Sequence, residues 1–129
     1  MIALAAFFFM QGAAPEPAPA PVPASLQAYY DCAAARSERL AAARDRRPAR
    51  DIVASAISSC GSLRGPALAA GLSLMLADPG VQAWIRTENV PPEEARRVGE
   101  FEFDRAMRRQ LLRNIGANPD TEGSSDARD

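Results

Sequence analysis

Apolar residues recur at helical spacing through residues 25–116, and helix-stopping residues divide this region into segments. The breaks fall at Arg46-Arg47-Pro48, Gly65-Pro66, Asp78-Pro79-Gly80 and Pro91-Pro92. The pattern predicts four to five helices, at about residues 26–46, 49–64, 67–77, 81–88 and 92–116. Ser25 is expected to cap the first of them, because its hydroxyl can accept a hydrogen bond from the first turn.

The first two predicted helices mirror each other about the bend at residues 46–48. Cys32 and Cys60 lie 14 residues before and 14 residues after position 46. At 1.5 Å per residue, each cysteine is therefore roughly 20 Å of helix from the bend. An antiparallel pair brings both sulfur atoms to the same height, so the spacing predicts a disulfide. Two unlinked buried thiols, acting as small apolar side chains, are the alternative.

This hairpin predicts an all-α fold: a small bundle of four to five helices built on an antiparallel helical hairpin and stapled by the Cys32–Cys60 disulfide. Residues 67–77 are apolar nearly all round, which is typical of a central helix or of one covered by a partner. Ala67 and Gly71 are small enough to let a neighbouring helix approach closely. Residues 98–104 alternate with period two, as a strand would, but no second strand exists to pair with them, so we expect a helix.

The chain opens with a nine-residue apolar run, Ile2–Met10, which is too short to span a membrane. Small residues follow it, and this arrangement is typical of a secretory signal peptide. Cleavage is expected after Ala14 or after Ala24, the second of which avoids a proline beside the scissile bond. The protein is therefore expected to be periplasmic or secreted. The alternative is an uncleaved N-terminal segment that tethers it to the membrane.

The predicted domain organisation has four parts. Residues 1–14 are a signal peptide or N-terminal hydrophobic segment, and residues 15–24 are an alanine- and proline-rich spacer. Residues 25–116 form the helical domain. Residues 117–129 are polar and acidic and are expected to be disordered.

The 129 residues include 2 cysteines and no histidine, and their formal net charge is −1. Histidine is the most common general base and metal ligand, so its absence weakens any catalytic or metal-binding interpretation. Zinc would need two further soft or imidazole ligands, and the cysteines do not form a CxxC pair. The sequence therefore predicts no catalytic residue, no cofactor and no metal.

Acidic residues of the last helix are the remaining candidates for chemistry. Glu100 and Asp104 share a helical face and could divide the roles of acid and base. Asp104 can instead pair with Arg108, four positions along a solvated helix. We favour the structural role, so an enzyme using paired carboxylates is the least favoured function.

Arginine supplies all 15 positive charges and is concentrated in two groups, one at the bend and one in the last helix. Residues 25–116 carry 14 arginines against 11 acids, an excess of +3 that is too small to predict nucleic-acid binding. Export would also separate the protein from nucleic acid, so no nucleic-acid partner is expected. The arginines can instead contact an anionic membrane surface. The possible anion contacts are Arg44, Arg46, Arg47, Arg50, Arg105, Arg108, Arg109 and Arg113.

These observations favour a small exported protein of the bacterial cell envelope with a binding or structural role and no catalytic activity. It would contact a protein partner, or itself as a homo-oligomer, through apolar surface. The possible partner surface comprises Leu72, Trp84, Phe101 and Phe103. The alternative is a peripheral membrane protein held by an uncleaved N-terminus and by arginine contacts to anionic lipids.

Overall fold

The computed structural model of this chain describes residues 21–43 and 46–119. Within those residues the fold is all-α, with five α-helices and no strand, which confirms the predicted fold class. The predicted signal peptide, most of the spacer and most of the acidic tail lie outside the described residues. The elements are α2 (Ala24–Ala42), α3 (Ala49–Ser59), the 3-10 helix η1 (Gly61–Leu63), α4 (Arg64–Ala77), α5 (Pro79–Thr87) and α6 (Pro92–Asn114).

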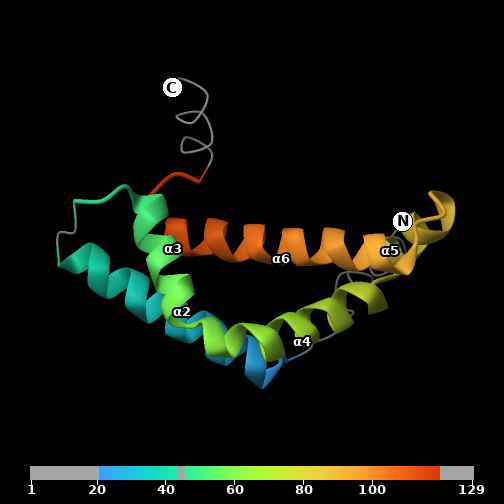
Figure 1. Ribbon diagram of the computed structural model, residues 1–129, viewed down its shortest axis with the longest axis horizontal. Coiled ribbons are helices and arrows are strands. Elements are labelled where there is room, and N and C mark those ends of the chain that lie inside the picture. Colours follow the sequence, from blue (N-terminus) through green and yellow to red (C-terminus); the bar gives the residue numbers. More distant parts are fainter. Residues whose placement is uncertain (1–20, 44–45, 120–129) are drawn as a thin grey trace, which may run out of the picture.

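Two regions can be distinguished in Figure 1. α2 and α3 pair, and α4 leaves the end of α3 at an angle of 62°. α6 returns past α4 and packs on α2 and α3. We call the hairpin and the helix segments packed on it the body. Residues 72–101, which hold the end of α4, all of α5 and the start of α6, form the arm.

The predicted disulfide is present in the body. Cys32 in α2 is joined to Cys60, the residue that follows α3, with the two Cα atoms 6.1 Å apart. The bond closes a loop with a sequence separation of 28. In the chain-entropy model, closing a loop of this length stabilises the folded state by about 3–4 kcal/mol.

The core of the body combines small residues with larger apolar side chains. Ala33, Ala56 and Ala67 are fully buried, which lets the helix backbones approach closely. Tyr29 and Leu111 are the largest fully buried side chains and fill the space between the helices. The staple therefore supplements a core that contains few large apolar groups.

Several predicted helix boundaries are wrong. α2 ends at Ala42 and not at residue 46, and α5 begins at Pro79 and not at residue 81. Pro23, not Ser25, is the N-cap of α2, because the extended proline-rich segment runs directly into the helix and places Ser25 inside it. The break after α3 falls at Gly61–Leu63, and not at Gly65-Pro66, which lies in the first turn of α4. Proline is tolerated there because the amides of a first helical turn have no intrahelical partner.

The arm contains a capped turn at the start of α5 and a close contact between α4 and α6. The Asp78 side chain accepts a hydrogen bond from the Val81 amide at 3.1 Å, so Asp78 caps α5 and Pro79 occupies its first position. Gly99 of α6 lies against Leu72 and Met75 of α4, and a Cβ at position 99 would overlap both side chains. Residues 98–104 are helical, as predicted.

Candidate functional site

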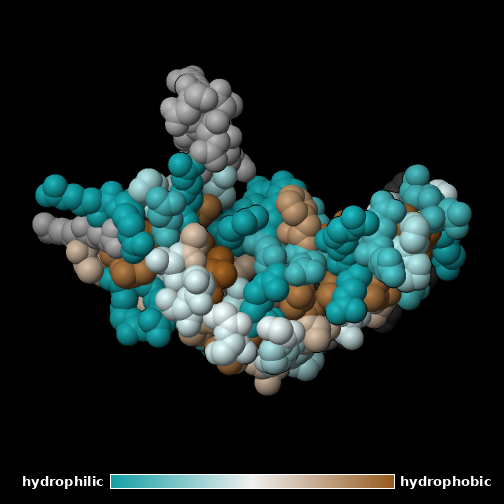
Figure 2. Space-filling view, in the orientation of Figure 1, coloured by the Kyte–Doolittle hydropathy of each residue, from teal (hydrophilic) through white to brown (hydrophobic). Residues whose placement is uncertain are grey.

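Large apolar side chains are exposed on the arm. Figure 2 shows hydrophobic residues among hydrophilic ones, and the surface is hollowed between the body and the end of the arm that carries α5. Val98 and Phe101, three positions apart and therefore on one face of α6, are 39% and 60% exposed. The exposed large apolar residues of the arm are Leu74, Leu76, Trp84, Val98 and Phe101.

Helix α5 has an apolar face with little to pack against. Val81, Trp84 and Ile85 follow the i, i+3, i+4 spacing of one helical face, yet α5 buries no residue. Its main neighbour is the end of α4. An amphipathic helix in this position can lay its apolar face into a groove or against the surface of another molecule.

The four residues of the predicted partner surface do not form one patch. Leu72 is 7% exposed and lies between α4 and α6. Phe103 is half-buried and stacks on Tyr29, with ring centroids 6.1 Å apart and planes within 9°. Trp84 and Phe101 remain exposed. The period-two pattern of residues 98–104 gave no sign that one phenylalanine would be exposed and the other half-buried. In a helix, residues two positions apart lie on nearly opposite sides, so Phe101 and Phe103 face different surroundings.

An apolar pocket of about 450 Å³ lies between the start of α2 and the middle of α6. Tyr30 stands in its wall and its hydroxyl accepts a hydrogen bond from the Asn114 side-chain amide at 2.6 Å. The pocket can hold an apolar side chain or a small apolar molecule. Its lining is Val22, Leu26, Gln27, Tyr30, Phe103, Ala106, Met107 and Gln110. The sequence analysis missed it, because α2 ends 50 positions before α6 begins and no local pattern joins them.

One arginine binds both candidate acid–base carboxylates. Arg64 of α4 donates two hydrogen bonds to Asp104, at 3.1 and 2.7 Å, and one to Glu100 at 3.0 Å. The predicted pairing of Asp104 with Arg108 is therefore wrong. Hydrogen bonds from the arginine to these two carboxylates, Asp104 first, raise the pKa of Arg64 above its usual range. This arrangement joins α4 to α6 where the arm leaves the body.

A buried tyrosine lies beside this ion-pair network. Tyr29 is fully buried, and its hydroxyl makes no hydrogen bond to any described residue. Burial and, second, the negative charge of Asp104 raise the pKa of the Tyr29 hydroxyl above its ordinary value of 10.0. Arg64 opposes this shift only in part.

The predicted anion contacts divide between the bend and the exposed side of α6. At the bend, Arg46 and Arg50 are exposed, Arg50 lies 4.0 Å from Asp51, and Arg44 is outside the described residues. Arg47 donates a hydrogen bond to the Ser55 hydroxyl at 3.1 Å. On α6, Arg105 pairs with Glu102 at 3.6 Å, Arg108 and Arg113 are exposed, and Arg109 is half-buried.

The described residues contain no group of three or more histidine, cysteine, aspartate or glutamate residues able to hold a metal ion. They also contain no single helix long and apolar enough to cross a membrane; α3 followed by η1 and α4 has the required length and composition only as a pair bent by 62°.

Comparisons of the chain with protein-family models, with curated proteins and with solved structures find no match.

Proposed function

We propose that this protein is a small exported binding protein of the bacterial cell envelope, without catalytic activity, whose arm packs against an apolar surface of another protein molecule. That molecule is a second copy of this chain or a different envelope protein. The apolar run at Ile2–Met10 and the disulfide support export, because disulfides persist in oxidising compartments.

The observation that carries the proposal is the exposure of large apolar side chains on a region with almost no core of its own. Phe101 is 60% exposed and Leu74 50% exposed, while the arm buries only a few residues between α4 and α6. Removing apolar surface from water contributes about 25 cal/mol per Å². A partner that covered the arm would therefore gain affinity from side chains that contribute little to the fold.

Site-specific photo-crosslinking tests the proposal. A photoreactive phenylalanine analogue is placed at Trp84 or at Phe101, and, as a matched control, at Ala35, an exposed position of α2 in the body. Cells producing each variant are irradiated and the adducts are separated by mass. We expect discrete adducts from both arm positions and none from position 35. Their masses distinguish a second copy of this chain from a different protein.

The absence of adducts from both arm positions, or equal yields from the arm and from position 35, would contradict the proposal. Export is tested separately by the intact mass of the protein recovered from its producing cells. We expect a chain that has lost residues 1–14 or residues 1–24 and contains no free thiol. A full-length chain with two free thiols would overturn the envelope assignment.

A further inference from the structure

A second pocket, of about 300 Å³, lies between α2 and α3, on the side of the disulfide that faces the bend. Among the described residues, three guanidinium groups and two hydroxyl groups surround it, and none of the described lining residues carries a carboxylate. The lining residues are Arg36, Arg39 and Leu40 of α2, Arg47 at the bend, and Ser55 and Ser59 of α3.

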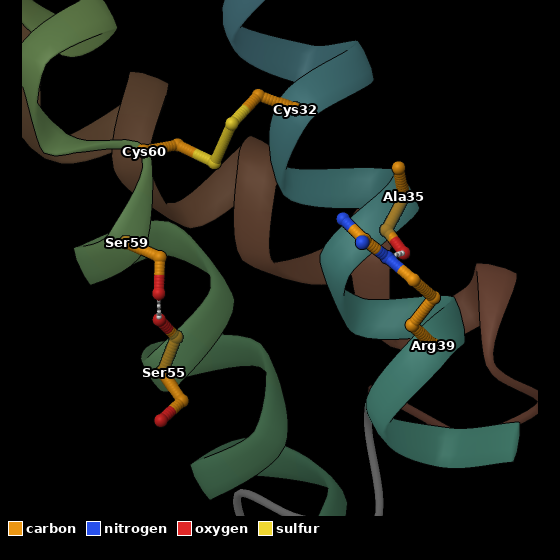
Figure 3. The surroundings of a disulfide bond; sticks show 6 residues. All are labelled: Cys32, Ala35, Arg39, Ser55, Ser59 and Cys60. Carbon is orange, nitrogen blue, oxygen red and sulfur yellow. Dashed lines mark hydrogen bonds between the residues drawn. A yellow bond between two sulfur atoms is a disulfide. The ribbon is translucent and has the colours of Figure 1, made fainter. Parts of the chain in front are cut away.

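Several hydrogen-bond donors converge on this pocket. Arg39 uses its Nε to donate to the Ala35 carbonyl at 3.4 Å, so its two terminal nitrogens are not engaged by that bond (Figure 3). The Ser55 hydroxyl accepts from Arg47 at 3.1 Å and therefore still has its own proton to donate. Arg36 makes no hydrogen bond or ion pair with any described residue.

Like charges gathered in one depression repel one another, and the repulsion falls when an anion lies between them. Arginine is suited to oxyanions, because its planar fork can donate two parallel hydrogen bonds to adjacent oxygens. The forks of Arg36 and Arg39, together with the Ser55 hydroxyl, can serve several oxygen atoms of one tetrahedral group. A planar carboxylate has only two oxygens and would satisfy fewer of these donors.

The disulfide holds the two walls of this pocket together. Arg36 lies one helical turn after Cys32, and Ser59 directly precedes Cys60. In Figure 3, the Arg39 side chain runs back along α2 towards Cys32, on the side that faces α3. The covalent bond therefore fixes the spacing of donors that come from separate helices.

We propose that this pocket binds a phosphate group, carried by a soluble phosphate ester or by the headgroup of an anionic phospholipid. The site is separate from the apolar arm and uses Arg36, Arg39 and the Ser55 hydroxyl, which the arginine clusters of the sequence did not include. The Ser59 hydroxyl lines the pocket but donates to the Ser55 carbonyl at 2.9 Å. The pocket is large enough for a phosphate and a small polar substituent such as glycerol.

Titrations of the full chain with inorganic phosphate and with glycerol 3-phosphate test the proposal. The readout is the chemical shift of the arginine Nε–H groups in ¹H–¹⁵N spectra. We expect saturable shifts at Arg36, Arg39 and Arg47 and none at Arg96 or Arg97, two exposed arginines of the arm. Shifts that grow without saturation and equally at all arginines would overturn the proposal, because they would report an adventitious ion atmosphere only.

Two double variants of equal charge separate a built site from general electrostatics. R36Q/R39Q removes two charges from the pocket, whereas R96Q/R97Q removes two charges from the arm. We expect R36Q/R39Q to weaken phosphate binding about tenfold or more, and R96Q/R97Q to leave it within about twofold. Circular dichroism checks that both variants are helical. Equal weakening in the two variants would contradict the proposal.

Vesicle co-sedimentation identifies the source of the phosphate group. Vesicles of phosphatidylglycerol mixed with phosphatidylcholine are compared with vesicles of phosphatidylcholine alone. Binding that needs phosphatidylglycerol, is competed by glycerol 3-phosphate and is lost in R36Q/R39Q assigns the site to a lipid headgroup. Saturable binding of glycerol 3-phosphate without binding to either vesicle assigns it to a soluble ester. Binding to neither probe overturns the proposal.

Discussion

Body and arm are built from the same kinds of helix, yet they bury very different shares of their apolar surface. The body encloses Tyr29, Val53 and Leu111 among closely packed alanines, and a disulfide links two of its helices. The arm consists of two helix ends and α5, and five of its large apolar side chains face solvent. The body therefore provides most of the stability, and the arm provides the surface suited to binding.

The largest expected effect concerns the staple of the body. Under oxidising conditions Cys32→Ser should lower the free energy of unfolding by about 3–4 kcal/mol, because the unfolded chain is no longer closed into a loop. Urea denaturation of both proteins with and without reductant measures this. In the presence of reductant the two proteins should differ little. Equal differences in both conditions would show that the bond contributes nothing.

Two glycine substitutions test how closely α4 and α6 pack within the arm. Gly99→Ala should be about 1 kcal/mol less stable than the control variant, because the ends of the Leu72 and Met75 side chains must move away from the new Cβ and this offsets the gain in helix propensity. Gly65→Ala is the control: its Cβ would meet no atom within 4 Å, so it should be neutral or stabilising by up to about 1 kcal/mol. Amide exchange should accelerate in the arm of Gly99→Ala and stay unchanged in the body. Matching changes in both variants would contradict the close α4–α6 contact.

In the core of the body, we expect one substitution to leave the free energy of unfolding unchanged or to raise it slightly. Tyr29→Phe removes a buried hydroxyl that makes no hydrogen bond to a described residue, so it should be neutral or stabilising by about 1 kcal/mol. Tyr30→Phe is the matched control. It removes the acceptor for Asn114 and should cost about 0.5–1.5 kcal/mol. Thermal denaturation of both variants distinguishes the two cases.

The burial of Tyr29 also leads us to expect that the free energy of unfolding depends on pH. Because the pKa of Tyr29 is raised in the folded protein, its contribution is fully present below pH 10.0 and is lost as the pH rises above that value. Only the unfolded chain then releases the proton easily. The free energy of unfolding should fall less steeply above pH 10.0 in Tyr29→Phe than in the unsubstituted protein. Identical slopes would mean that Tyr29 is not buried.

The smallest change in the free energy of unfolding is expected for a substitution on the surface of the arm. Phe101→Gln should change the free energy of unfolding by less than about 0.5 kcal/mol, because the ring is 60% exposed. The same substitution should abolish the crosslinks formed from Trp84 if both side chains contact one partner. A loss of more than 1 kcal/mol in urea denaturation would indicate that the ring packs in the fold, and the contrast between the two regions would then fail.

Local signals predicted the hairpin and its disulfide well. The symmetric spacing of Cys32 and Cys60 about the bend needs only the rise of a helix. The pattern predicts a helix that starts at residue 81, after Asp78-Pro79-Gly80, but α5 begins two residues earlier, at Pro79. The helical state of residues 98–104 followed because the sequence offers no second strand candidate to pair with them. Each of these inferences depends on residues that are close in sequence or on a single simple distance.

Features that depend on distant segments could not be predicted. Arg64 binds Glu100 and Asp104, which are 36 and 40 positions away, so the local pairing rule selected Arg108 instead. The apolar pocket joins Leu26 to Met107, and no periodicity in either helix indicates that contact. Phe101 and Phe103 differ in burial because α6 meets a neighbour on one side only. Tertiary packing decides such cases.

The position of Cys60 has a mechanical consequence. Cys60 directly precedes η1, which leads into α4. The disulfide therefore connects α2 to the start of α4 by a path that does not include the bend. Tension applied between the start of α2 and the arm would bypass the intervening loop, whose sequence separation is 28. That loop represents a contour length of roughly 95 Å, which would extend under load only after the sulfur bridge had been reduced.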